Sequence, residues 1–224
     1  MKSLDSRQNP GRGMQEVLKR GVDIVLSGIG LLLSSPLWFT VAVAIVAEDG
    51  LPVFFCQDRW GRGGSIFHAL KFRTMWRGSE KTRSVQAGHQ DSRITKVGRF
   101  LRACALDELP QLWNIFRGDM SFVGPRALPI NEIQATRGGN DIPDEAIRGF
   151  RQRLTVRPGL TGIAQIFADR DTTRERKFRY DLFYISRQDF WLDLRLIVLS
   201  FYISFLGRWE VRGGKFNRRR AGAI

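Results

Sequence analysis

The sequence predicts an α+β fold that is mainly helical, with a small β-hairpin and a long apolar helix near the N-terminus. Three observations lead to this fold class. Residues 24–47 carry no charge, and residues 52–75 contain two strand-like segments around a glycine-rich turn. Three later segments have the apolar spacing or the end signals of helices. With 224 residues, of which 43% are hydrophobic, the chain suits one domain with a buried core.

The apolar run is long enough to cross a membrane. A spanning helix needs about 20 predominantly apolar residues, and residues 24–47 supply 24. The run is longer than the apolar part of a signal peptide, and no Ala-x-Ala cleavage site follows it. These properties are typical of a single-pass anchor.

Two features favour instead a re-entrant membrane helix, which enters the membrane and returns to the same side. Both flanks are basic, with a net charge of +2 before residue 24 and +12 after residue 47, and positive flanks stay on the cytoplasmic side. Ser35 and Pro36 lie near the middle of the run, where proline kinks a helix and leaves two halves too short to cross. From the residues alone, both arrangements remain open.

We expect the four parts of the chain to form one domain: a basic segment (1–23), the membrane helix (24–47), a cytoplasmic catalytic region (48–207) and a basic tail (208–224). The turn RWGRGG predicts the hairpin, and residues 77–92 and 137–144 are polar loops.

The three later helices follow from start and stop signals. A helix is expected from about Thr95, and a second opens at Asp107 and Glu108 and ends at Gly118. Residues 192–206 form a mostly apolar helix that either belongs to the core or lies flat at a membrane interface.

The charge of the chain restricts its partners. Lysine and arginine total 36 against 22 acidic residues, a net charge of +14, which favours nucleic acid, anionic lipid or a phosphate-bearing substrate. Two cysteines and two histidines exclude a disulfide-rich scaffold and a His/Cys metal cluster.

The candidate chemistry centres on the adjacent carboxylates Asp107 and Glu108. The simpler interpretation is that they complement a helix dipole. However, a carboxylate can also attack phosphorus, and Mg²⁺ held by carboxylates and substrate oxygens would neutralise the charge that opposes the attack. Three basic residues, Lys71, Arg102 and Arg126, could contact phosphate. This pattern favours phosphate chemistry without identifying the reaction.

Several segments, in order, resemble the bacterial sugar transferase family, the monotopic phosphoglycosyl transferases. The resemblance runs from about Lys19 to Ile197, and its most specific part is the block around the two carboxylates. The segments are KRGVDIVLSGIGLLLSSP, QDRWGRGGSIFHALKFRTM, DSRITKVGRFLR, LDELPQLWNIFRGDMSFVGPR, VRPGLTGIAQ and YDLFYISRQDFWLDLRLI.

This resemblance implies an enzyme on the cytoplasmic face of the bacterial inner membrane. It would transfer a sugar-1-phosphate from a nucleotide diphosphate sugar, usually a UDP-sugar, to undecaprenyl phosphate and release UMP. That step initiates the synthesis of exopolysaccharide, capsule, O-antigen or another glycoconjugate.

The resemblance also implies roles for the site residues. Asp107 would form a covalent aspartyl phospho-sugar intermediate, and Glu108 would support it and help to hold Mg²⁺. Lys71, Arg102 and Arg126 would bind the substrate phosphates. The break in the re-entrant helix would fall at Ser35 and Pro36.

Three residues depart from the family pattern. Ala105 stands where Ser or Thr is frequent, Ala127 replaces a proline, and Ile163 replaces a tryptophan. None removes a reactive group, but they leave the loop geometry and the sugar specificity open.

Two functions of other classes compete with the transferase. One is a basic module that binds anionic lipid or nucleic acid without chemistry, and the other is a single-pass scaffold. No recognisable nucleic-acid-binding motif is present, so we expect contacts with anionic membrane lipids and none with nucleic acid. Homo-oligomerisation remains open.

Overall fold

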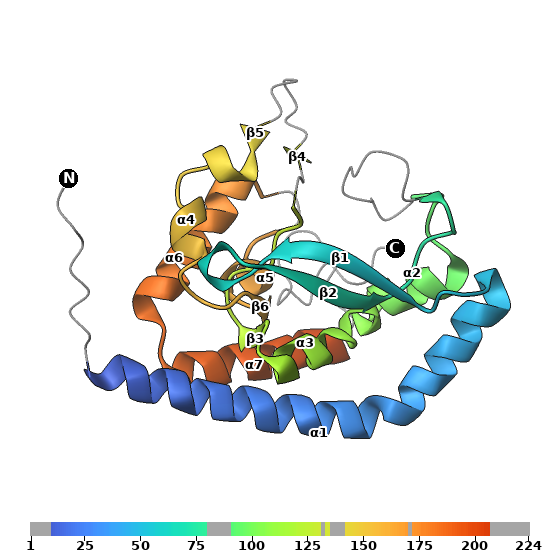
Figure 1. Ribbon diagram of the computed structural model, residues 1–224, viewed down its shortest axis with the longest axis horizontal. Coiled ribbons are helices and arrows are strands. Elements are labelled where there is room, and N and C mark those ends of the chain that lie inside the picture. The colour runs from blue at the N-terminus through green and yellow to red at the C-terminus, as the bar shows by residue number, and fades with distance from the viewer. Residues whose placement is uncertain (1–9, 80–90, 131–132, 135–141, 170–171, 207–224) are drawn as a thin grey trace.

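The computed structural model describes residues 10–79, 91–130, 133–134, 142–169 and 172–206. The long helix α1 (Pro10–Asp49) runs along one edge, and the remaining helices and a central hairpin lie on one side of it (Figure 1). The mixed and mainly helical fold, the apolar N-terminal helix and the hairpin are therefore confirmed.

The hairpin joins β1 (Phe54–Trp60) to β2 (Ile66–Phe72) in antiparallel register, with Phe54 opposite Phe72 and Trp60 opposite Ile66. The other elements, in chain order, are α2 (Lys96–Ala103), a 3₁₀ turn (Leu106–Glu108), α3 (Gln111–Arg117), β3 (Ser121–Val123), β4 (Ile133–Gln134), β5 (Ile142–Pro143), a 3₁₀ turn (Asp144–Ala146), α4 (Phe150–Arg153), β6 (Gly159–Thr161), α5 (Ile163–Phe167), α6 (Arg174–Arg187) and α7 (Phe190–Phe205).

The core lies between the hairpin and the helices α3, α5, α6 and α7. Ala69 of β2, Ile115 of α3 and Ile203 of α7 are fully buried there. Asn114 ties α3 to the hairpin, because its amide donates to the His68 carbonyl at 2.8 Å and accepts from the Leu70 amide at 3.0 Å. The core therefore fixes α3 against β2.

Pro36 lies inside α1, and the helix is continuous across it. The expected break into two helices is therefore wrong, although Figure 1 shows that α1 bends along its course, as helices with an internal proline do. Pro36 cannot donate to the Leu32 carbonyl, and the Ser35 hydroxyl donates to it instead at 2.8 Å. This replacement bond lets the helix continue.

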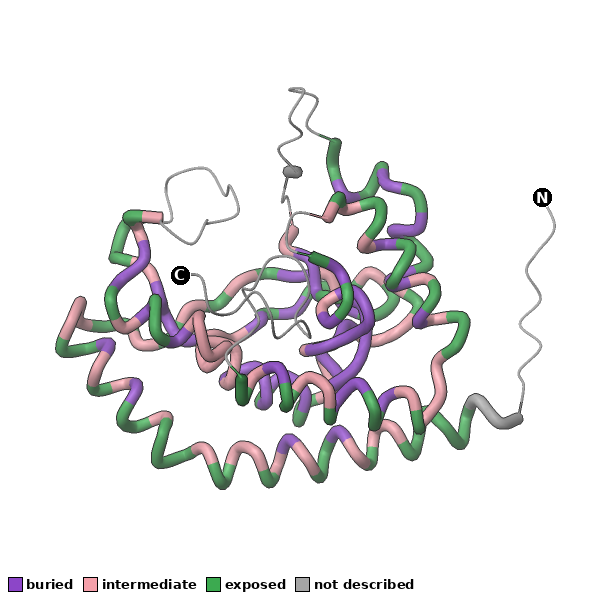
Figure 2. The backbone as a smooth tube through the Cα atoms, turned by 180° about the vertical axis from the view of Figure 1, so that it is seen from behind, coloured by how far each residue is buried: buried purple, intermediate pink, exposed green. Residues whose placement is uncertain are grey.

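Most of the apolar surface of α1 is uncovered by the described residues. By length and composition, the segment Gly13–Asp49 could cross a membrane. Leu32, Leu33 and Phe39 are each more than 70% exposed, and Figure 2 shows buried positions only at intervals along the helix.

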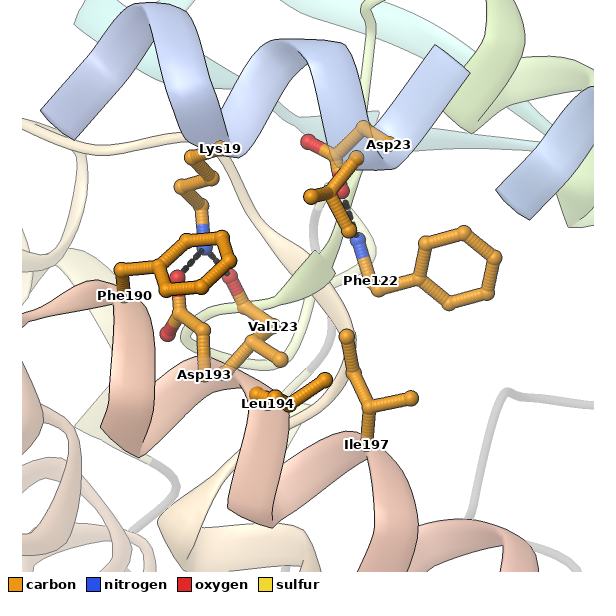
Figure 3. Close-up of a pocket in the computed structure, with 9 residues that line it drawn as sticks. Lys19, Asp23, Phe122, Val123, Phe190, Asp193, Leu194 and Ile197 are labelled. Carbon is orange, nitrogen blue, oxygen red and sulfur yellow. Dashed lines mark hydrogen bonds and ion pairs between the residues drawn. The ribbon is translucent and has the colours of Figure 1, made fainter. Parts of the chain in front are cut away.

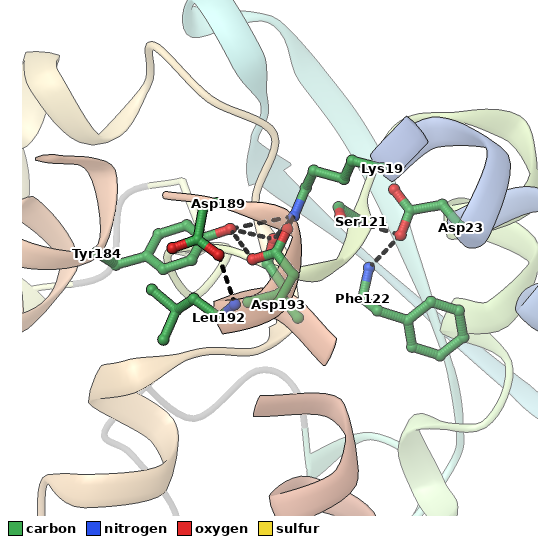
Figure 4. A network of polar contacts seen from close by, with 9 residues as sticks. Lys19, Asp23, Ser121, Phe122, Tyr184, Asp189, Leu192 and Asp193 are labelled. Carbon is green, nitrogen blue, oxygen red and sulfur yellow. Dashed lines mark hydrogen bonds and ion pairs between the residues drawn. The ribbon is translucent and has the colours of Figure 1, made fainter. Parts of the chain in front are cut away.

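Buried polar contacts attach the first part of α1 to β3 and α7 (Figure 4). The Lys19 ammonium contacts the Asp193 carboxylate at 2.5 Å and the Val123 carbonyl at 2.8 Å. One oxygen of Asp23 accepts from the Phe122 amide at 2.9 Å and the Ser121 hydroxyl at 3.1 Å. Figure 3 shows the small pocket between the same three elements, which Lys19, Asp23 and Asp193 help to line.

One other sequence expectation needs correction. Asp107 and Glu108 do not open the helix that ends at Gly118; they lie in a separate 3₁₀ turn, and α3 begins only at Gln111. The reason is local, since Ala105 adopts a left-handed conformation (φ 56°) that ends the preceding helix. The sequence did not predict the parallel pairing of β3 with β6. Strands of three residues are too short to show the alternation of apolar and polar residues that identifies a strand.

The helix expected at residues 192–206 is confirmed as α7, and one side of it belongs to the core. Leu196 and Ile203 are buried in the core, whereas Trp191, Phe201 and Phe205 are more than 60% exposed. The charge run of the tail, residues 208–224, and most of the polar loops lie outside the described residues.

We expect Lys19→Met to destabilise the fold by about 3–5 kcal/mol, because it leaves the largely buried Asp193 carboxylate without its cation. Thermal unfolding in detergent should show a lower Tm. The control is Glu16→Gln, which breaks the exposed pair of Glu16 with Arg62 and should cost less than about 0.5 kcal/mol. Equal Tm values for both variants would contradict this attachment of α1.

Candidate active site

Three of the predicted site residues meet at one carboxylate. The Lys71 ammonium lies 2.6 Å from Glu108 Oε1, and the Arg126 guanidinium lies 3.5 Å from the same oxygen. Lys71 lies at the C-terminal end of β2, Glu108 in the 3₁₀ turn and Arg126 in the segment after β3. The fold therefore brings together cations and a carboxylate that are far apart in the sequence.

The 3₁₀ turn is placed by α2 and by the far end of α1. The Thr95 hydroxyl caps α2 by accepting from the Gly98 amide at 2.8 Å, and the Glu48 carboxylate of α1 accepts from the Lys96 and Val97 amides at 2.7 and 2.9 Å. The left-handed Ala105 then turns the chain into Asp107 and Glu108. Thus α1 caps the helix that leads into the site.

A close approach fixes α2 against the end of the hairpin. A Cβ atom on Gly98 would lie 2.1 Å from the Thr74 carbonyl oxygen, so only glycine fits. On the next turn of α2, Arg102 Nε donates to the Thr74 hydroxyl at 2.9 Å. Its positive charge opposes the rise in the pKa of Asp107 that burial causes, so Arg102 lies close enough to act on that carboxylate.

The two carboxylates have different surroundings. Burial alone would raise the pKa of Glu108, but the charges of Lys71 and Arg126 outweigh it and hold that pKa at about 2. Burial raises the pKa of Asp107, and the adjacent Glu108 raises it further, against the opposing charge of Lys71. Burial likewise lowers the pKa of Lys71, against the opposing charges of the two carboxylates. Glu108 is therefore the ionised partner of the cations.

Asp107 makes no hydrogen bond or ion pair with any residue that the structure describes. Its carboxylate is half-buried, beside three cations, and is not held by any of them. Two carboxylates whose surroundings separate their pKa values are typical of sites that assign them different tasks. Here Glu108 is paired and Asp107 is available to a ligand.

The donor set suits Mg²⁺ bound together with a phosphate-bearing ligand. No group of three or more His, Cys, Asp or Glu side chains that could bind a metal occurs among the described residues. Mg²⁺ in phosphate-transfer sites is instead held by one or two carboxylates, with the remaining ligands from substrate and water. Asp107 and Glu108 fit that pattern.

Sequence reasoning missed Arg59. This arginine is buried in β1, donates to the Ala127 carbonyl at 2.6 Å and lowers the pKa of both Lys71 and Glu108 through its charge. Its only signal in the sequence is its place in the segment QDRWGRGG, which we interpreted as hairpin and turn.

The other residues singled out in the sequence lie outside the carboxylate cluster. Ser35 and Pro36 belong to α1 and make their contacts within that helix. Ala127 and Ile163 are buried in the core, so these two departures from the family pattern are accommodated by packing.

Comparisons with known proteins show which family the sequence matches. The bacterial sugar transferase family matches residues 14–207. A UDP-glucose:undecaprenyl-phosphate glucose-1-phosphate transferase of Klebsiella pneumoniae is 38% identical over 205 residues, 89% of this chain and 43% of the relative. The chain thus spans less than half the length of this relative.

Two further relatives differ in name and in length. A UDP-N-acetylgalactosamine-undecaprenyl-phosphate N-acetylgalactosaminephosphotransferase of Aeromonas hydrophila is 39% identical, over 80% of this chain and 42% of the relative. The exopolysaccharide production protein PSS of Rhizobium leguminosarum bv. phaseoli is 36% identical, over 82% of this chain and 93% of the relative.

We expect Lys71→Met to raise the pKa of Glu108 from about 2 to above the ordinary value of about 4.3. Burial of Glu108 persists in this variant, whereas the strongest attractive charge is lost. Carbon-13 NMR titration of labelled glutamate carboxyls would measure the change. A Glu108 resonance that still titrates near pH 2 would contradict the electrostatic role of Lys71.

Proposed function

The chain belongs to the bacterial sugar transferase family, and we propose that it transfers a sugar-1-phosphate from a UDP-sugar to undecaprenyl phosphate and releases UMP. The names of the relatives support this reaction. The observation that carries the proposal is the pair of carboxylates, in which Glu108 is neutralised by Lys71 and Arg126 while Asp107 is left available. Such a site can bind a diphosphate and offer it a nucleophile.

We propose that Asp107 is the nucleophile of the first step. One carboxylate oxygen attacks the phosphorus that bears the sugar, and the bond from that phosphorus to the oxygen bridging the two phosphates breaks. The electron pair leaves with UMP, and the sugar phosphate remains on Asp107. Arg102 and Arg126 would contact the phosphate oxygens, whose charge grows as the bond breaks.

In the second step, an oxygen of undecaprenyl phosphate attacks the same phosphorus. The bond from phosphorus to the Asp107 oxygen breaks, and its electron pair restores the carboxylate. The product is an undecaprenyl diphosphate sugar. Because the carboxylate is restored, one nucleophile serves both substrates in turn.

Asp107 and Glu108 would hold Mg²⁺, together with oxygens of the donor diphosphate. The ion would supply positive charge that offsets the repulsion between the carboxylate and the phosphates. Lys71 keeps Glu108 ionised, and therefore able to act as a ligand.

The acceptor is a membrane lipid, so the site must lie at a membrane surface. We propose that the apolar part of α1, residues 24–47, most of whose apolar surface is uncovered, enters the membrane as a bent, re-entrant helix. The region 48–207 would stay on the cytoplasmic face of the inner membrane. The basic segments at 1–23 and 208–224 would contact anionic lipids. The exposed aromatic side chains of α7, including Trp191 and Phe205, are suited to the interface.

The identity of the sugar and the glycan that contains it are part of the same proposal. One relative is named for exopolysaccharide production, which favours initiation of an exopolysaccharide. The donors named in the relatives carry glucose or N-acetylgalactosamine, and these two UDP-sugars are the first to test.

We expect Asp107→Asn to lower UMP release by at least about 10³-fold, because an amide cannot replace the carboxylate as nucleophile. The assay uses membranes with undecaprenyl phosphate, Mg²⁺ and a panel of UDP-sugars. The control is Asp58→Asn, which changes an exposed carboxylate that is paired with His68 on the hairpin. Turnover by Asp107→Asn near that of the control would exclude Asp107 as nucleophile.

Labelling of cysteines in intact cells tests the re-entrant arrangement. Met14 is exposed before the apolar run and Cys56 is exposed after it. We expect neither Met14→Cys in a Cys56→Ser background nor the native Cys56 to react with an impermeant maleimide until the cells are opened. Labelling of Met14→Cys alone in intact cells would show that α1 spans the membrane.

A further inference from the structure

We propose that Arg153 is a positioning residue that acts through Arg126, by holding the main chain of the segment that presents the Arg126 guanidinium to Glu108. The inference rests on the proposed role of Arg126 in donor binding.

Four consecutive carbonyl groups of this segment accept hydrogen bonds. Those of Pro125 and Leu128 accept from the backbone amides of Gly159 and Trp60, at 2.8 and 3.0 Å. The two between them accept from buried arginines: Arg153 Nη2 donates to the Arg126 carbonyl at 2.8 Å, and Arg59 Nη1 donates to the Ala127 carbonyl at 2.6 Å. Two arginine side chains thus take the place of a neighbouring strand.

Arg153 is itself fixed on three sides. It lies at the end of α4 and is 4% exposed. Its Nε donates to the Asp181 carboxylate of α6 at 2.7 Å, and its guanidinium carbon lies 4.2 Å from the centre of the Phe178 ring. The guanidinium therefore has one orientation, in which its remaining end reaches the Arg126 carbonyl.

The chemistry of the side chain favours positioning over general stabilisation. An ion pair as buried as that of Arg153 with Asp181, in which both side chains are 3% exposed, gains little or nothing over an apolar pair of the same volume. What an apolar pair could not supply is a donor to the Arg126 carbonyl. Because Arg153 is buried and bonded to the Arg126 carbonyl, we expect it to affect binding of the UDP-sugar through Arg126.

Lysine at position 153 is the discriminating substitution. A guanidinium offers donors in a fixed fork, whereas an ammonium is a point charge on a flexible stem. Arg153→Lys keeps the charge opposite Asp181 but cannot hold that carboxylate and the Arg126 carbonyl with the same geometry. The matched control is Arg174→Lys, which changes the neighbouring ion pair of Arg174 with the buried Asp144.

The test is a double-mutant cycle on UMP release from the UDP-sugar. If Arg153 acts through Arg126, Arg153→Lys lowers kcat/KM for the donor about tenfold in the wild-type chain but less than about twofold in an Arg126→Ala background. Equal losses in both backgrounds, or no loss in the wild-type chain, would overturn the inference. Full activity of Arg126→Ala would also overturn it, by removing the role of Arg126.

Hydrogen exchange gives a readout that needs no activity. Amides in a peptide covering residues 124–128 should exchange about tenfold faster in Arg153→Lys and at the wild-type rate in Arg174→Lys. Unchanged exchange in Arg153→Lys would refute the positioning role. If that variant does not fold, Asp181→Asn replaces it in both experiments with the same outcomes. Absence of UMP release from the wild-type chain would refute the proposed function, and exchange would still decide whether Arg153 holds the segment.

Discussion

The attachment of α1 to the rest of the chain is the constraint on which the site depends. Near its start, Lys19 and Asp23 hold β3, which leads into Arg126. At its end, Glu48 caps α2, which leads into Asp107 and Glu108. The two segments that carry Arg126 and the two carboxylates are thus fixed to the same helix, on either side of its mostly uncovered apolar part. A helix that sets the depth of the domain at a membrane would set the depth of the site as well.

Charge placement, and not the stability gained from ion pairs, explains the cluster around the carboxylates. Removing ions from water costs several kcal/mol for each ion, so such pairs contribute little net stability. Their effect here is to separate the pKa values of the two carboxylates. Glu108 is kept ionised by Lys71 and Arg126, whereas burial raises the pKa of Asp107, which has no partner among the described residues. A bound diphosphate would bring its own negative charge to the cations and leave Asp107 facing phosphorus.

Local signals in the sequence predicted local structure, but they did not predict the contacts between distant segments. The glycine-rich turn located the hairpin, Thr95 the start of α2 and Gly118 the end of α3, because each signal acts within a few residues. The 3₁₀ turn that carries Asp107 and Glu108 depends on the left-handed conformation of Ala105. An alanine in the sequence gives no signal for that conformation. The buried arginines at 59 and 153 look like surface residues in a basic sequence, and only the fold shows that they donate to the segment after β3. The family resemblance singled out the candidate site residues, and the fold shows which neighbours position them.

The covalent role of Asp107 is the central claim, and intact-protein mass spectrometry tests it most directly. The chain is mixed with a UDP-sugar and Mg²⁺ while undecaprenyl phosphate is withheld, and the mass is then compared with that of Asp107→Asn. The account predicts that the mass of the wild-type chain rises by one sugar phosphate, on the peptide that contains Asp107, and returns to its starting value when the acceptor is added. UMP release that requires both substrates together, with no adduct on Asp107 at any time, would contradict it.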